Sequence, residues 1–93
     1  MGINQTLKAL ADPVRRNILE MLKQGPKSAG EIAQAFELTP ATVSYHLSQL
    51  KKAVLLLEEK KKNFIYYSLD ITVFEEILVW FQSLGGGNGN EKK

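Results

Sequence analysis

The stretch from residue 39 to residue 52, TPATVSYHLSQLKK, decides the fold because it combines a helix start with two unlike helix faces. Thr39 can accept a hydrogen bond from an unpaired backbone N–H, and Pro40 suits the first helical position, where no donor is needed. Val43, Leu47 and Leu50 follow the i, i+4, i+7 spacing of a helix that buries one apolar side. The opposite side is small and rich in hydroxyl groups.

The residues before this stretch predict two further helices. Asp12-Pro13 repeats the same helix start, Gly25-Pro26 ends that helix, and Ser28 with Glu31 forms a capping box for the next one. One-sided apolar spacing supports both helices, with Val14, Ile18, Met21 and Leu22 in the first and Ala29, Ile32, Ala33 and Phe36 in the second. The short turn at residues 36–38, with Leu38 in the core, then joins the helix of residues 28–36 to that of residues 40–52, which predicts a helix-turn-helix unit.

After Ala53 the pattern becomes typical of strands. Residues 54–59 and 63–69 are β-prone and flank three consecutive lysines, which predicts a hairpin with a charged tip. We expect Asn63 to supply the positive φ of the turn. Alternation leaves open which face of the second strand packs on the helices, because both sets of side chains are largely apolar.

The two ends of the chain predict an interface. Asp70 is expected to cap a last helix in which the apolar residues form two adjoining stripes, wider than one small core requires. A shorter stripe lies near the N-terminus. Together they predict a homodimer interface made of Ile3, Leu7, Leu10, Phe74, Ile77, Leu78, Trp80, Phe81 and Leu84. The alternative is that the first and last helices cover each other within one chain. Residues 1–84 then form the domain, and residues 85–93 a flexible tail.

Composition limits the classes of function. With 93 residues, 44% of them hydrophobic and 24% charged, the chain is an ordinary small globular domain. It has no cysteine, which excludes disulfides and thiolate metal sites, and its single histidine, His46, lies at the core edge of a helix. We expect His46 to be structural, with a phosphate contact as the alternative. Without a nucleophile-base pair or a phosphate loop, neither an enzyme nor a cofactor is expected.

Neither a signal peptide nor a membrane span is indicated, so a cytoplasmic protein without membrane insertion is expected.

Charge is unevenly distributed along the chain. Residues 1–69 contain ten Lys and Arg against six Asp and Glu, whereas residues 70–84 contain three acidic residues and no basic one. This asymmetry favours an anionic partner for the first part, although ordinary solvated charge is the alternative.

The polar side of the helix of residues 40–52 is typical of a surface that reads DNA. Small side chains allow close approach, and hydroxyl and amide groups can bond to base edges or phosphates. The major groove, roughly 12 Å wide, admits one helix. The lysines that follow would contact the phosphate backbone.

Three segments make the chain resemble the ArsR-type winged helix-turn-helix repressors. They are LKALADPVRRNILEML at residues 7–22, SAGEIAQAFELTPATVSYHLSQLKKA at residues 28–53 and FIYYSL at residues 64–69. The resemblance covers residues 3–84 and looks closest to the metal-independent autorepressors of the SdpR-like group. It implies a mainly α fold with a small β-hairpin, dimerisation through the N- and C-terminal helices, a recognition helix in the major groove and a wing on the adjacent backbone.

The resemblance and the polar helix face together define the candidate DNA-binding residues, which are Thr39, Ala41, Thr42, Ser44, Tyr45, Ser48, Gln49, Arg15, Arg16, Lys60, Lys61 and Lys62. Two alternatives for Arg15 and Arg16 are a solvated helix face and an ion pair with Glu20. The family's metal sensors use cysteines or clusters on the last helix that are absent here, so no metal is expected. Val54 and Leu57 also depart from the family pattern, which leaves Leu57 exposed or in contact with a partner.

The resulting hypothesis is a sequence-specific, possibly autoregulatory repressor that acts as a homodimer on an inverted repeat of double-stranded DNA. A protein or a small molecule could serve as its inducer. The alternative is a winged-helix protein-interaction module in which the apolar residues 54–57 form the binding edge.

Overall fold

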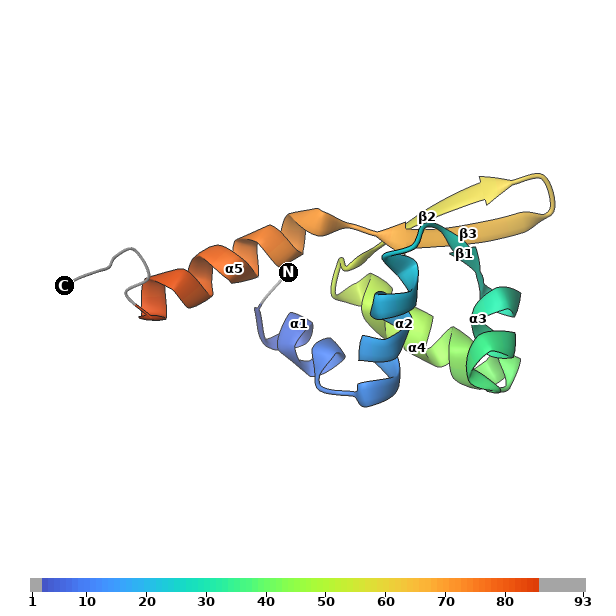
Figure 1. Cartoon of the computed structure of the whole chain (residues 1–93), viewed down its shortest axis with the longest axis horizontal. Helices are drawn as coiled ribbons and strands as arrows, with labels where there is room; N and C mark the ends of the chain where they lie inside the picture. Colours follow the sequence, from blue (N-terminus) through green and yellow to red (C-terminus); the bar gives the residue numbers. More distant parts are fainter. Residues whose placement is uncertain (1–2, 86–93) are drawn as a thin grey trace.

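The computed structural model describes residues 3–85. Within this range, five helices and three short strands follow one another in the order α1 (Ile3–Leu10), α2 (Pro13–Leu22), β1 (Lys27–Ser28), α3 (Ala29–Phe36), α4 (Pro40–Lys52), β2 (Leu56–Lys61), β3 (Phe64–Leu69) and α5 (Ile71–Gly85) (Figure 1). The predicted tail lies outside the described residues except for Gly85, which ends α5.

The structure confirms the predicted helix starts, where each capping side chain bonds to a backbone group two or three residues further along the chain. Asp12 accepts hydrogen bonds from the backbone N–H groups of Val14 at 2.8 Å and Arg15 at 3.1 Å. Ser28 and the Glu31 side chain satisfy each other's backbone donors, which completes the capping box. Thr39 accepts from the backbone of Thr42 at 3.2 Å and Asp70 from Thr72 at 3.0 Å.

The core lies where α2, α3 and α4 meet the start of the hairpin. Its fully buried members come from all three helices and from the segment before β2, and include Ile18, Ile32, Val43, Leu50 and Leu55. Leu38, in the turn between α3 and α4, packs against this cluster as predicted. The helix-turn-helix unit is therefore the centre of the hydrophobic core.

The sheet has one strand more than the predicted hairpin. Its antiparallel order is β1-β3-β2, and β1 pairs Lys27 with Tyr67 and Ser28 with Tyr66. Two residues carry too little periodicity to be recognised as a strand. Because Ser28 also caps α3, the wing is hydrogen-bonded to the start of the helix-turn-helix unit.

The hairpin corrects two predictions. Lys60 and Lys61 belong to strand β2 rather than to the turn, and Lys62, at φ 56°, supplies the left-handed residue that was expected at Asn63. Val54 does not begin a strand. With φ 58°, it ends α4 in a left-handed turn, closed by bonds from the N–H of Val54 to Lys51 at 2.9 Å and from that of Leu55 to Leu50 at 3.0 Å.

The structure also resolves the two faces of β3. Tyr67 and Leu69 pack against the core, whereas Phe64 is 58% exposed and contacts the ring of Tyr66 on the other face. The run at residues 54–57 is split in the same way, since Leu55 and Leu56 are buried and Leu57 is 53% exposed. Leu57 is thus exposed, one of the two outcomes that the sequence left open.

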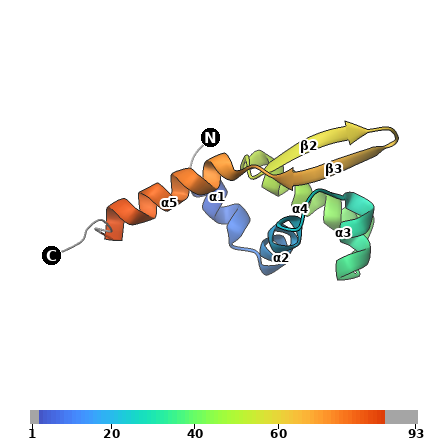
Figure 2. The ribbon, with the colours of Figure 1, turned by 45° about the horizontal axis from the view of Figure 1, so that its top comes forward.

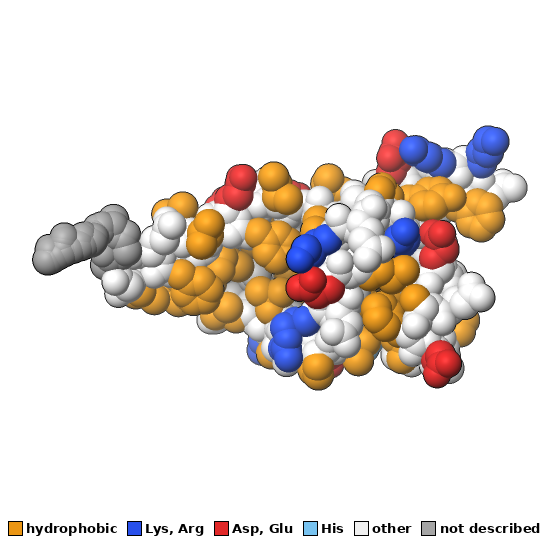
Figure 3. All heavy atoms as spheres, viewed as in Figure 1, with side chains coloured by type: hydrophobic (Ala, Val, Ile, Leu, Met, Phe, Trp, Pro, Cys, Tyr) orange, Lys and Arg blue, Asp and Glu red, His pale blue; other side chains and the backbone are white. Residues whose placement is uncertain are grey.

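The hairpin and α5 extend from opposite ends of the helical body, which makes the chain elongated, at 53 × 24 × 23 Å (Figures 1 and 2). The first turns of α5 contact the body, where Val73 is buried and Phe74 and Ile77 are packed against the core. Beyond them α5 has little cover, as the space-filling view shows on one face (Figure 3).

The uncovered part of α5 is apolar. Leu78 is 57%, Val79 64% and Leu84 66% exposed, and Trp80 and Phe81 are exposed as well. The alternative in which the first and last helices simply cover each other is therefore wrong for these residues. A large exposed apolar surface on a small domain usually marks an interaction site.

Candidate nucleic-acid interface

The polar side of α4 is uncovered in the structure. The side chains of Ala41, Ser44, Tyr45 and Ser48 are exposed. Tyr45 is the bulkiest of these residues, and 57% of its surface is accessible to solvent. The apolar side of the same helix is buried, as predicted. One face of α4 is therefore fully occupied by the core, and the other is free for a partner.

Two hydroxyl groups at the start of α4 are engaged with each other. Thr39 caps the helix and donates its own proton to the hydroxyl oxygen of Thr42 at 2.9 Å. Since Thr42 is the acceptor in this bond, its own hydroxyl proton is not used by it. The backbone N–H groups in the first turn of a helix also favour anions. This end of α4 thus offers several donors within a small area.

His46 is part of the protein interior. It is 7% exposed, its Nδ1 lies 3.2 Å from Nη1 of Arg15, and its ring meets that of Tyr45 edge-on with 5.5 Å between centroids. The structural interpretation of the sequence is confirmed. The side chain holds Arg15 on one side and supports Tyr45 on the other.

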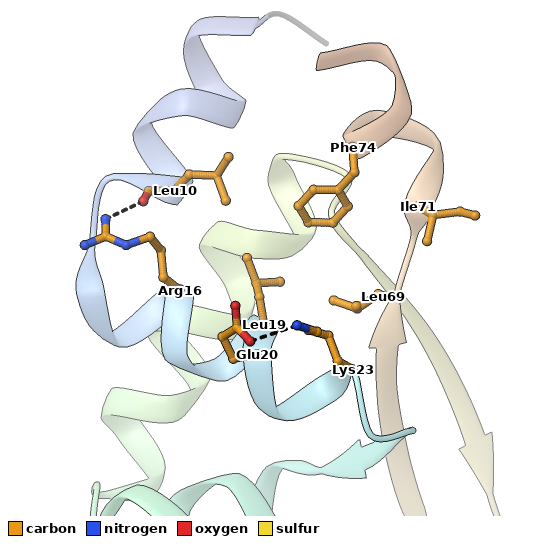
Figure 4. Close-up of a pocket in the computed structure, with 8 residues that line it drawn as sticks. All are labelled: Leu10, Arg16, Leu19, Glu20, Lys23, Leu69, Ile71 and Phe74. Atoms are coloured by element: carbon orange, nitrogen blue, oxygen red, sulfur yellow. Dashed lines mark hydrogen bonds and ion pairs between the residues drawn. The ribbon is translucent and has the colours of Figure 1, made fainter. Parts of the chain in front are cut away.

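Arg15 and Arg16 point to different parts of the molecule. Arg15 reaches α4 through His46 and also bonds to two backbone carbonyls of α1. Arg16 donates to the carbonyl of Leu10 at 2.8 Å and lines a pocket of about 370 Å³ between α1, α2 and α5 (Figure 4). The two arginines therefore do not form one basic patch, and neither forms the ion pair with Glu20, which pairs with Lys23 instead.

The lysines of the hairpin tip are exposed, and Figure 3 shows basic side chains at that end. Lys61 lies 4.0 Å from Glu59, a distance at which an exposed pair interacts weakly. Lys51, at the end of α4, is paired with Glu58 of β2, and this hydrogen bond raises the pKa of Lys51. At the end of α4 and in the hairpin, Lys52, Lys60 and Lys62 therefore carry positive charges that no ion pair among residues 3–85 offsets.

Polar side chains of α1 lie beside α4. Asn4, Gln5 and Lys8 of α1 line a small pocket together with Gln49 of α4. From the apolar spacing, α1 was expected only in the dimer interface, and its polar side was not predicted. An i, i+4 spacing of Asn4 and Lys8 was the available signal.

Among residues 3–85, no three His, Cys, Asp or Glu side chains come together in a way that could hold a metal ion. The helices in this part of the chain are too short or too polar to cross a membrane.

The helix-turn-helix unit matches a known family. Residues 10–59, which include α2, α3 and α4, match a family described as a helix-turn-helix domain. Transcriptional repressor SdpR of Bacillus subtilis is 42% identical over 84% of this chain and 87% of its own length. The chain belongs to the ArsR-type winged helix-turn-helix regulators.

Other members of the ArsR-type family agree over nearly the whole chain. The arsenical resistance operon repressor of B. subtilis is 33% identical over 90% of this chain and 86% of its own length. A homodimeric winged helix-turn-helix DNA-binding domain from Mycobacterium bovis superimposes with a TM-score of 0.74 and 26% identity, over 90% of this chain and 78% of that one. The two B. subtilis relatives are transcriptional repressors, and the M. bovis domain is described as a possible ArsR-family transcriptional regulator.

Proposed function

We propose that the protein is a sequence-specific DNA-binding repressor that acts as a homodimer on an inverted repeat, in the cytoplasm and without a bound metal or cofactor. The observation that carries the proposal is the uncovered polar side of α4, with Tyr45 at its centre and basic residues at its flanks. A face of this kind fits a major groove, and the tip lysines fit the phosphates beside it.

Within this proposal the candidate residues have three roles. Base contacts fall to the exposed face of α4, from Ala41 to Gln49, and phosphate contacts to residues 60–62. Arg16 bonds to the carbonyl of Leu10 and lines the pocket beside α5, so no DNA contact is assigned to it. Thr39 contributes mainly by ordering the first turn of α4, since its hydroxyl caps the helix.

The dimer interface is proposed to consist of α1 and the uncovered side of α5. Ile3 and Leu7 of α1 are 36% and 37% exposed, and α5 adds six large apolar side chains that are more exposed than those. Of the predicted interface residues, six are exposed, namely Ile3, Leu7, Leu78, Trp80, Phe81 and Leu84. The other three, Leu10, Phe74 and Ile77, are half-buried against the core of their own chain and can contribute only their outer edges. Ile71 and Val79, at 60% and 64% exposed, join the proposed interface although the sequence pattern did not single them out. Repression would follow when the bound dimer covers a promoter, including the promoter of its own gene.

The test is selection of binding sites from a random duplex library at fixed salt. We expect an enriched inverted repeat with half-sites about one helical turn apart. Its affinity and that of a scrambled duplex are then measured over a salt series, where each phosphate contact contributes a log-log slope of about −0.9. Absence of an enriched sequence, with weak binding at every salt concentration, would refute the proposal and favour a protein-interaction module.

A further inference from the structure

Arg15 joins three helices through one guanidinium group. From α2, its Nε donates to the carbonyl of Ala9 at 2.8 Å and its Nη2 to that of Lys8 at 3.3 Å. These carbonyls belong to the last turn of α1, where intrahelical donors run out, and that of Lys8 also accepts from the N–H of Ala11 at 3.2 Å. The third contact, from Nη1 to Nδ1 of His46 at 3.2 Å, reaches α4.

The chemistry of these groups makes the junction rigid. A guanidinium is planar, permanently charged and without an acceptor, so Nδ1 of His46 must accept and the imidazole proton lies on Nε2. The imidazole is almost fully buried and packs edge-on against Tyr45, which lies on the exposed side of α4. A continuous chain of contacts therefore runs from the end of α1 to the exposed polar face of α4, which is the candidate DNA-binding surface.

We propose that Arg15 is a positioning residue that holds α4 in a fixed place relative to α1 and so sets the half-site spacing that the dimer accepts. The inference rests on the proposed function, in which α1 belongs to the dimer interface and α4 reads the DNA. One base pair changes the separation of two half-sites by about 3.4 Å and their relative rotation by about 35°. A dimer rejects such a change only if its two recognition helices are firmly attached to the interface.

A phosphate contact is the competing role for Arg15, and lysine separates the two. Arg15→Lys keeps the positive charge but cannot hold three partners in one plane. Arg16→Lys is the matched control, because Arg16 is the next residue of α2 and its side chain donates to Leu10 of α1.

The experiment measures affinity at fixed salt for three duplexes: the selected operator, the same operator with one base pair inserted at its centre, and a scrambled sequence. We expect the wild-type protein to lose at least tenfold in affinity on insertion, about the cost of one mismatched contact. Arg15→Lys should reduce this discrimination to about threefold or less, with its affinity for scrambled DNA unchanged within twofold. Arg16→Lys should discriminate like the wild type.

The acceptor on α4 provides a second, independent pair of variants. His46→Asn places an amide oxygen near the position of Nδ1, whereas His46→Leu fills the buried site with an apolar group and removes the acceptor. The positioning role predicts that the asparagine variant keeps more of the spacing discrimination. A simple packing role predicts the reverse, because leucine suits a buried site better than asparagine does.

Each outcome decides between these roles. Equal losses of Arg15→Lys on operator and scrambled DNA would make Arg15 a phosphate contact, and unchanged spacing discrimination would overturn the positioning role while leaving the proposed function intact. A wild-type protein that prefers no duplex would refute the proposed function itself, and the spacing role with it. Circular dichroism of each variant confirms that folded proteins are compared.

Discussion

Glu37, in the turn between α3 and α4, occupies a backbone conformation that suits glycine. Its φ of 54° and ψ of 44° are left-handed, and its side chain is exposed. The surrounding backbone bonds, from Glu37 to Gln34 and from Leu38 to Ala33, do not depend on the side chain. Glu37→Gly therefore changes the conformational cost of the turn without removing a packed group.

The size of the effect follows from two opposing contributions. An L-residue in the left-handed region costs about 1–2 kcal/mol. Glycine gives the unfolded chain more freedom, which costs roughly 0.4–1 kcal/mol. We expect Glu37→Gly to raise the free energy of unfolding by about 0.5–1 kcal/mol, and the melting temperature by a few degrees.

The assay is urea unfolding followed by circular dichroism, at one protomer concentration because dimerisation adds stability by mass action. Glu37→Ala is the control, since it removes the same carboxylate but keeps the Cβ atom and the strained conformation. A glycine variant no more stable than the alanine variant would refute the argument that the turn stores backbone strain.

Four further predictions follow from the structure. Val54→Gly relieves the same kind of strain but loses contacts of a side chain that is only 39% exposed, so its unfolding free energy should stay within about 0.5 kcal/mol of the wild type in the same urea assay. Tyr45→Ala should weaken operator binding more than scrambled DNA binding, whereas Lys61→Ala should weaken both about equally in binding titrations; equal losses for the tyrosine variant would remove it from base reading. Leu78→Asp, at an exposed position of α5, should give a folded monomer by analytical ultracentrifugation, and a persistent dimer would contradict the proposed interface. The pKa of Asp12 is lowered chiefly by the hydrogen bond from the backbone of Arg15, so its cap stabilises above the ordinary aspartate pKa and is lost as pH falls through the lowered value; Asp12→Asn should flatten this acid dependence in thermal unfolding, and an unchanged dependence would exclude the cap as its source.

The features that the sequence predicted correctly are local. Asp12, Ser28, Thr39 and Asp70 cap helices through atoms two or three residues away, so a short window contains both partners. The apolar side of α4 was equally accessible, because helical periodicity alone determines which residues share a face.

The features that the sequence could not provide depend on distant partners or on tolerated strain. Strand β1 exists because Ser28 meets Tyr66, far along the chain. Nothing in the residue type of Val54 predicts a positive φ, since β-branched side chains disfavour it. Arg15 was a candidate phosphate contact in the sequence. Its position next to His46 could not be predicted, because that contact arises only when α2 packs on α4.

If the uncovered apolar side of α5 forms the dimer interface, the amount of DNA-binding dimer depends on the concentration of the protein itself. If reading an inverted repeat requires two copies, then at low expression the active species grows with the square of the protomer concentration. A twofold fall in synthesis then lowers the dimer by roughly fourfold. An autoregulated promoter controlled in this way would reopen steeply as the cell dilutes the protein by growth, and the steepness would come from α5 rather than from the surface that touches DNA.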